Sequence, residues 1–155
     1  MYPKIKVISY KCHVKIWVIY TTKTFIKFNK FLLFMATILC VDDDKNYLRL
    51  IKRDLVETGY NVVDVQNGRD AIAKVREGSI DLVVLDCEMP FMDDIETMAR
   101  IIAINNQMPV ILNSEHTGYQ NNYLAWAASA YVVKSSDSAQ LKRVIKLVLD
   151  RRQST

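Results

Sequence analysis

The chain has 155 residues, half of them hydrophobic, which suits a single domain with a full core. Its three cysteines lie far apart and form no C-x-x-C pair, which excludes a disulfide framework and a cysteine-based zinc site as the organising feature. The net charge of +4 is uneven, because residues 1–35 hold seven lysines and no acid whereas the remainder holds 14 basic and 17 acidic residues, so the globular part has no nucleic-acid footprint of its own.

The first 34 residues form a basic, aromatic extension. Lysines interrupt every apolar run that could serve as a secretory signal, except residues 31–41. That run has 11 residues, too few to span a bilayer, so we expect no membrane span and a cytoplasmic location. Three interpretations of the extension stay open: a segment upstream of a natural start at Met35, a basic arm that meets anionic lipid or nucleic acid, or an extra element packed on a domain over residues 35–155.

From residue 35 onward, short apolar runs alternate with amphipathic stretches. The apolar runs predict strands at 37–41, 60–65, 80–86, 109–113 and 130–133. Apolar residues at helical spacing predict helices at 44–58, 68–77, 93–105 and 118–129, and a last helix after Asp137. The expected apolar face of the third helix is Ile95, Met98, Ala99 and Ile102, and that of the last is Leu141, Val144, Ile145, Val148 and Leu149.

The predicted boundaries have recognisable signals. Asp44 and Asp137 are expected to cap helices, and Asn67-Gly68 marks a turn into one. Gly59 and Gly78 follow helices as terminators. Five strands separated by five helices predict an α/β fold, a doubly wound parallel sheet with helices on both faces.

The third predicted strand carries the chemistry. Leu82–Asp86 has no polar side until it ends on a carboxylate, and Met89-Pro90 then interrupts the chain. Open α/β sheets place their sites at such strand ends. A core strand with a solvated acidic end is the simpler alternative.

Further polar residues follow the other strands. Asp42 and Asp43 follow the first strand, Ser114 the fourth, and Lys134 the fifth, which also contains Tyr131. In this order and spacing, together with Asp86 and Met89-Pro90, they resemble the receiver domain of two-component response regulators. The resemblance spans residues 35–152 and implies a flavodoxin-like sheet of strand order 2-1-3-4-5.

The resemblance also implies roles for these residues. Asp86 would be the phosphoacceptor, and Mg²⁺ or Mn²⁺ would be held by Asp42, Asp43, Asp86 and the backbone carbonyl of Glu88, with Asp42 acting largely through water. A cation suits this set, because neighbouring carboxylates otherwise repel one another. Lys134 would neutralise phosphoryl charge, and Ser114 and Tyr131 would form the switch.

The implied function is that of a stand-alone response regulator, a signalling switch rather than an enzyme. A sensor histidine kinase or histidine phosphotransfer protein would supply the phosphoryl group. The fourth helix, fifth strand and last helix would contact an unidentified downstream protein, through a face with Trp126, Tyr131, Lys142, Arg143 and Lys146.

The sequence departs from the family pattern near the site. Phe91 and Asp94 replace glycines, Ser114 replaces the commoner threonine, and Ser135 replaces a proline that follows the lysine across a cis bond. Glu115 stands where receivers carry a small residue at the site entrance. We expect Glu115 to restrict access, giving slow labelling by acetyl phosphate and a long-lived phosphorylated state.

Other interpretations of these residues stay open. Asp42 to Asp44 suit helix capping, Ser114 a turn, Tyr131 a static core position and Lys134 a solvated strand end. Cys87 and His116 suggest a thiol nucleophile with a base, although no orienting group is evident. Two other classes also remain, a receiver-shaped interaction module that is not phosphorylated and a haloacid-dehalogenase-type phosphatase built on Asp42-Asp43-Asp44.

Overall fold

Five short strands form one parallel sheet in the computed structural model, which describes residues 36–89, 94–116 and 127–152. The strands are β1 (Thr37–Val41), β2 (Asn61–Val65), β3 (Leu82–Asp86), β4 (Val110–Ser114) and β5 (Ala130–Val133). Their order is β2-β1-β3-β4-β5, and every neighbouring pair is parallel. The predicted fold class and strand order are therefore confirmed.

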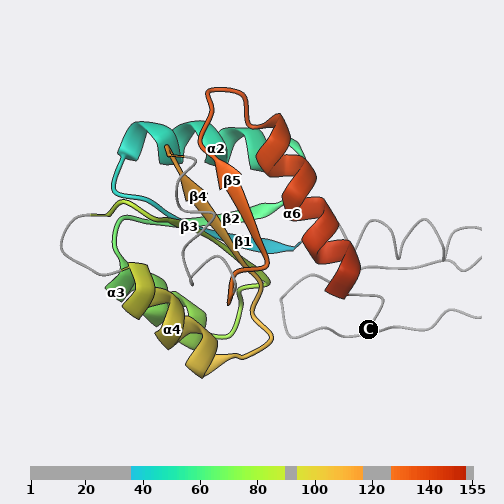
Figure 1. The fold of residues 1–155 in the computed structure, drawn as a ribbon. Coiled ribbons are helices and arrows are strands. Elements are labelled where there is room, and N and C mark those ends of the chain that lie inside the picture. The colour runs from blue at the N-terminus through green and yellow to red at the C-terminus, as the bar shows by residue number, and fades with distance from the viewer. Residues whose placement is uncertain (1–35, 90–93, 117–126, 153–155) are drawn as a thin grey trace, which may run out of the picture. The chain divides into compact units, whose positions relative to one another are not determined.

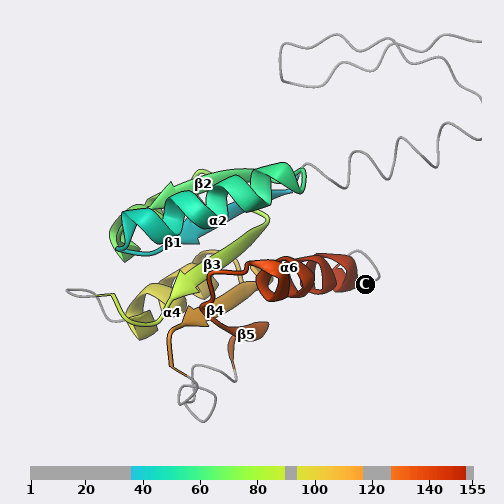
Figure 2. The same cartoon turned by 90° about the horizontal axis from the view of Figure 1, so that it is seen from above.

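Helices cover both faces of the sheet. In the described part of the chain they are α2 (Lys45–Glu57), α3 (Gly68–Arg76), α4 (Asp94–Ile104) and α6 (Ala139–Arg152). α2 and α6 lie on one face, and α3 and α4 lie on the other (Figures 1 and 2). The N-terminal extension and most of the helix predicted at 118–129, including Trp126, lie outside the described residues.

Alternate residues of the strands supply two separate cores. Leu39, Val83 and Leu85 pack with α3 and α4, whereas Cys40 and Val84 pack with α2 and α6. All five residues of β3 are buried, which explains why its sequence has no polar side before Asp86. In β1 and β3 the acids therefore stand where the strands end, at one edge of the sheet.

The predicted helix boundaries are confirmed by capping contacts. The Asp44 side chain accepts a hydrogen bond from the Asn46 backbone N–H at 2.7 Å. The Asn67 side chain accepts from the Asp70 N–H at 2.9 Å, and that of Asp137 accepts from the Ala139 N–H at 2.8 Å. Gly59 and Gly78 follow α2 and α3 with φ of 101° and 79°, a region that favours glycine.

The predicted apolar face of α4 needs a correction. Among the described side chains of α4, Met98 and Ile101 are the buried apolar ones, while Ala99 is exposed and Ile102 is only partly buried. The side chain of Ile95, the first residue of the predicted face, lies outside the described part of the structure. Ile101 and Ile102 are adjacent and both apolar, so helical spacing alone did not show which of them faces the core. Packing against the sheet and α3 turns the face with Met98 and Ile101 inward.

Two further features concern the described helices and peptide bonds. Among the described helices, none combines the length and apolarity that a membrane crossing requires. The described residues contain no cis peptide bond, so the Lys134–Ser135 bond is trans.

Candidate phosphoryl-acceptor site

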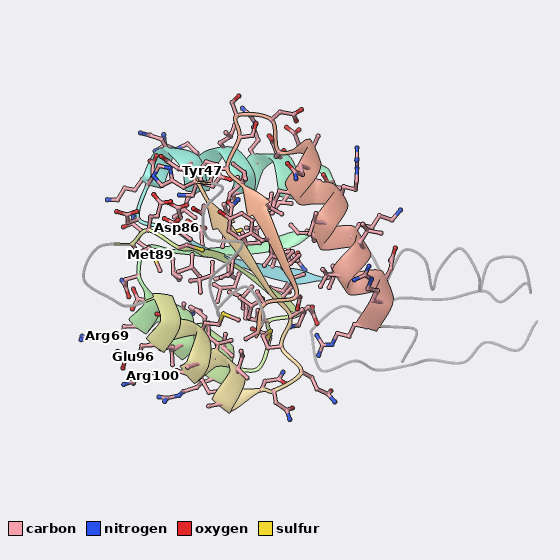
Figure 3. All side chains as sticks on the ribbon, viewed as in Figure 1. Tyr47, Arg69, Asp86, Met89, Glu96 and Arg100 are labelled. Atoms are coloured by element: carbon pink, nitrogen blue, oxygen red, sulfur yellow. The ribbon has the colours of Figure 1, made fainter. Side chains whose placement is uncertain are left out.

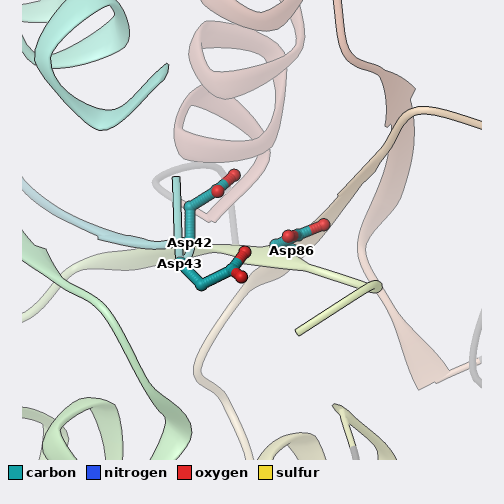
Figure 4. Close-up of side chains that lie close together, drawn as sticks. All are labelled: Asp42, Asp43 and Asp86. Carbon is teal, nitrogen blue, oxygen red and sulfur yellow. The ribbon is translucent and has the colours of Figure 1, made fainter. Parts of the chain in front are cut away.

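Three carboxylates meet at the carboxyl end of the sheet. Asp42 and Asp43 directly follow β1, and Asp86 ends β3, the neighbouring strand. One oxygen from each of the three lies within 4.8 Å of the others (Figure 4). Asp42 and Asp86 are each only 2% exposed, whereas Asp43 is exposed. The sheet therefore brings together the three acids that the sequence singled out, because parallel strands end at one edge.

Lys134 is the cationic partner of the buried acids. Its Nζ donates to Asp42 Oδ2 at 2.8 Å and to Asp86 Oδ2 at 3.1 Å. The Lys134 side chain is 10% exposed, so these ion pairs are shielded from solvent. The solvated position considered for Lys134 is therefore wrong, and the lysine is part of the site.

Burial determines the electrostatics of this cluster. Burial raises the pKa of Asp86 to about 6, and the neighbouring charge of Asp42 adds to the rise while Lys134 opposes it. Burial likewise raises the pKa of Asp42, against the hydrogen bond from Lys134. Burial alone would lower the pKa of Lys134, but its hydrogen bond to Asp42 and the charge of Asp86 outweigh burial and raise it. The lysine thus stays protonated beside two acids that have been partly deprived of water.

The donor set fits a hard divalent cation. The three carboxylates surround one point and offer only oxygen atoms, which suits Mg²⁺ or Mn²⁺. A single lysine leaves the cluster with an excess of negative charge when all three acids are ionised. The backbone N–H of Glu88 donates to Asp86 Oδ1 at 3.2 Å, so the residue expected to add a carbonyl ligand lies beside the cluster.

Ser114 is buried and is already engaged by an acid. Its Oγ donates to Glu88 Oε1 at 2.6 Å and accepts from the His116 backbone N–H at 3.1 Å. His116 Nε2 lies 3.7 Å from Glu88 Oε2. The sequence predicted Glu88 as a backbone ligand with a charge near the acceptor, but not the hydrogen bond of its side chain, because strand order alone does not fix how the residues beyond β3 turn toward β4.

Tyr131 and Glu115 both lie near the contact of Ser114 with Glu88, but Tyr131 is partly buried and Glu115 is exposed. The Tyr131 hydroxyl donates to the backbone carbonyl of His116, and the tyrosine is partly buried against the core on the α3 and α4 face. Glu115 is exposed, in the turn that follows β4. Cys87 is buried in the core whereas His116 is exposed toward Glu88, which argues against a thiol–imidazole pair.

A tyrosine and an asparagine that the sequence analysis did not select complete the site. Tyr47, in the first turn of α2, donates from its hydroxyl to Asn113 Oδ1 at 2.6 Å. Its ring centroid lies 5.0 Å from Lys134 Nζ, and Tyr47 and Asp86 lie at the same end of the sheet (Figure 3). Burial raises the pKa of Tyr47 to about 12, so the hydroxyl keeps its proton. Asn113 offered a signal, since it is a polar residue in an otherwise apolar run and a buried amide needs partners.

Comparisons with known proteins agree with this geometry. Residues 38–146 match the family of response regulator receiver domains. The response regulator TrrA of Thermotoga maritima, crystallised with Mg(2+)-BeF, is 37% identical, with a TM-score of 0.70, over 74% of this chain and 99% of that one. A CheY-like receiver domain protein of Methanospirillum hungatei is 26% identical, with a TM-score of 0.71, over 77% of this chain and 98% of that one.

Curated relatives are longer proteins. The transcriptional regulatory proteins ZraR of Salmonella typhimurium and PrrA of Mycobacterium tuberculosis are 33% and 32% identical over 120 residues, each covering 76% of this chain. The chain spans only 27% and 52% of these two relatives.

Proposed function

The chain belongs to the family of response regulator receiver domains, and from this we propose that it is a phosphorylation switch whose acceptor is Asp86. The observation that carries the proposal is the buried Asp86 carboxylate, which shares the Lys134 ammonium with the buried Asp42. An acid with only a structural role would be destabilised by a second buried acid beside it. At a phosphoryl-acceptor site a second acid is useful, because it helps to hold the cations that neutralise the incoming charge.

The chemistry follows from the groups at the site. A carboxylate oxygen of Asp86 attacks the phosphorus of a phosphohistidine, a P–O bond forms, and the P–N bond breaks with its electron pair passing to the imidazole nitrogen. Lys134 stabilises the negative charge on the phosphoryl oxygens. A bound Mg²⁺ would be held by Asp42, Asp43 and Asp86, with the Glu88 carbonyl, and would supply further charge neutralisation. Water later attacks the phosphorus, releases inorganic phosphate and restores the Asp86 carboxylate.

The switch is a change of partner for Ser114. In the structure its hydroxyl donates to Glu88, and in the phosphorylated state it donates to a phosphoryl oxygen instead. The Tyr131 hydroxyl is tied to the backbone two residues beyond Ser114, so a movement of that turn reaches β5. We expect the signal to leave through β5, α6 and the helix predicted at 118–129, most of which lies outside the described residues. Arg143 and Lys146 are exposed on α6.

The partners follow from the same chemistry. TrrA has been solved in complex with the histidine kinase ThkA, which supports a histidine kinase as the donor here. We expect the chain to act as a switch without a substrate of its own, in the cytoplasm, and through a separate downstream protein. That the protein is a stand-alone receiver stays a prediction. The chain covers nearly all of the TrrA chain, but only about a quarter of ZraR and about half of PrrA.

The decisive experiment measures acid-labile phosphorylation of the full chain by a panel of phosphorylated histidine kinases, with and without Mg²⁺. Wild type should take up one phosphoryl group only when the cation is present, and Asp86→Asn should take up none. Asp44→Asn is the matched control, since it removes an adjacent exposed carboxylate while asparagine still caps α2. Undiminished labelling of Asp86→Asn would refute the assignment. Failure of every donor to label wild type would favour an interaction module that is not phosphorylated.

A further inference from the structure

The Lys134 ammonium is covered by an aromatic ring that comes from a different layer of the fold. Tyr47 lies on α2, and its ring centroid is 5.0 Å from Lys134 Nζ, which is within the range of a cation–π contact. The same ammonium donates to Asp42 and Asp86 at 2.8 and 3.1 Å. The lysine head is therefore enclosed by two carboxylates and one ring, which explains its low exposure.

The ring is held in place by a buried amide. Asn113 is 1% exposed, and its Oδ1 accepts the Tyr47 hydroxyl at 2.6 Å while its Nδ2 donates to the Val132 carbonyl at 3.1 Å. In the sheet register Asn113 pairs with Asp86 on one side and with Val132 on the other. The Asn113 side chain thus connects β5, which leads to the lysine, with the helix that carries the ring, while its backbone lies in register with the acceptor strand.

We propose that Tyr47 and Asn113 are positioning residues of the phosphoryl site, which hold the Lys134 ammonium against Asp42 and Asp86. The role in phosphoryl transfer rests on the proposed function, whereas the enclosure of the lysine does not. Neither residue touches the acceptor oxygen; each acts through Lys134.

The physical reason is the flexibility of lysine. Its ammonium is a strongly hydrated charge on a four-carbon stem, and it gains entropy and water when it swings into solvent. The Tyr47 ring blocks that route and contributes its own attraction, and the exclusion of water strengthens both ion pairs. Asn113 fixes the ring by accepting its hydroxyl, at a buried position where an unpaired amide oxygen is unfavourable.

The enclosure is tested without a phosphoryl donor. The full chain is treated briefly with acetic anhydride, and acetylation of Lys134 is measured by mass spectrometry relative to the exposed Lys52. Tyr47→Leu should raise the relative labelling of Lys134 at least about threefold, and Tyr47→Phe, which keeps the ring, should give a smaller rise. Tyr60→Leu is the matched control, because Tyr60 is a buried tyrosine of the same core that directly precedes β2, beyond the far end of α2. Equal labelling of Lys134 in wild type and Tyr47→Leu would overturn the enclosure.

The positioning role is tested by the rate of labelling with acetyl phosphate and Mg²⁺, on variants shown to be folded. Tyr47→Leu should slow labelling roughly threefold to tenfold, Tyr47→Phe and Asn113→Val should slow it less, and Tyr60→Leu should leave it unchanged. Equal slowing by Tyr47→Leu and Tyr60→Leu would show that general packing is responsible and would overturn the proposal. If wild type is not labelled by any donor, the proposed function fails, while the acetylation experiment still decides the enclosure.

Discussion

Replacing the acceptor Asp86 by asparagine should stabilise the metal-free protein. The Asp86 carboxylate is 2% exposed and lies beside the buried Asp42, and burial followed by that neighbouring charge raises its pKa from an ordinary 3.8 to about 6. At about 1.36 kcal/mol for each pKa unit, ionised Asp86 costs the folded state about 3 kcal/mol at neutral pH. Asparagine keeps the shape and carries no charge. The opposing attraction of Lys134 is already part of this raised pKa, so we expect a gain of about 1–3 kcal/mol.

The gain should depend on pH in a defined direction. Because the folded-state pKa is raised, the native protein binds more protons than the unfolded chain between about pH 4 and pH 6. Wild-type stability therefore falls, relative to that of Asp86→Asn, as the pH rises through this window. The difference between the two proteins should be small near pH 4, about half its full size near pH 5, and complete above about pH 7.

The assay is urea unfolding of both proteins in EDTA across this pH range. Asp44→Asn serves as the control, since it removes an exposed charge with its cap retained and should change stability by less than about 0.5 kcal/mol. Mg²⁺ should then stabilise wild type more than Asp86→Asn, because it binds the folded cluster. A gain that is absent at neutral pH, or that is the same near pH 5 as near pH 7, would refute the reasoning.

Three other predictions concern access, signalling and the extension. Glu88→Ala should free the Ser114 hydroxyl and remove a charge beside the acceptor, so labelling by acetyl phosphate should rise about fivefold, more at low salt than at high. Glu115→Ala should also raise labelling by acetyl phosphate, but less than Glu88→Ala does, because Glu115 is exposed and solvent screens its charge. A larger effect of Glu115→Ala than of Glu88→Ala would contradict the structure. Amide exchange with Mg²⁺ and beryllofluoride should change in β5, α6 and the helix predicted at 118–129, and a change confined to α2 and β2 would place the signalling surface elsewhere. A protein that starts at Met35 should accept phosphate at the full-length rate, because residues 1–34 supply no acid; failure to fold would make the extension structural.

Local patterns determined most of the elements. The run of Leu82–Asp86 predicts a buried strand because none of its first four residues can face water, and β3 is buried throughout. Asp44 and Asn67 predicted helix starts because their short side chains can accept a backbone N–H nearby, which each of them does. Such signals involve partners within a few residues, so they can be read before the chain has folded. The strand order came from the resemblance of the whole motif set rather than from any of these local patterns.

Contacts between distant residues were decided by the tertiary structure. The spacing of Asp42, Asp86 and Lys134 indicated a common site, but the ion pairs depend on how β1, β3 and the end of β5 are placed across the sheet. Asn113 stood out in the sequence as a polar residue in an apolar run, but its partner did not, and neither did the contact of Ser114 with Glu88. Ser114 and Glu88 are 26 residues apart, and the pairing of β3 with β4 brings them together. Tyr47 and Asn113 are 66 residues apart, and the packing of α2 on the sheet brings them together. A one-dimensional pattern shows which residues must be buried, whereas the partners of buried polar groups are chosen by the geometry of the sheet.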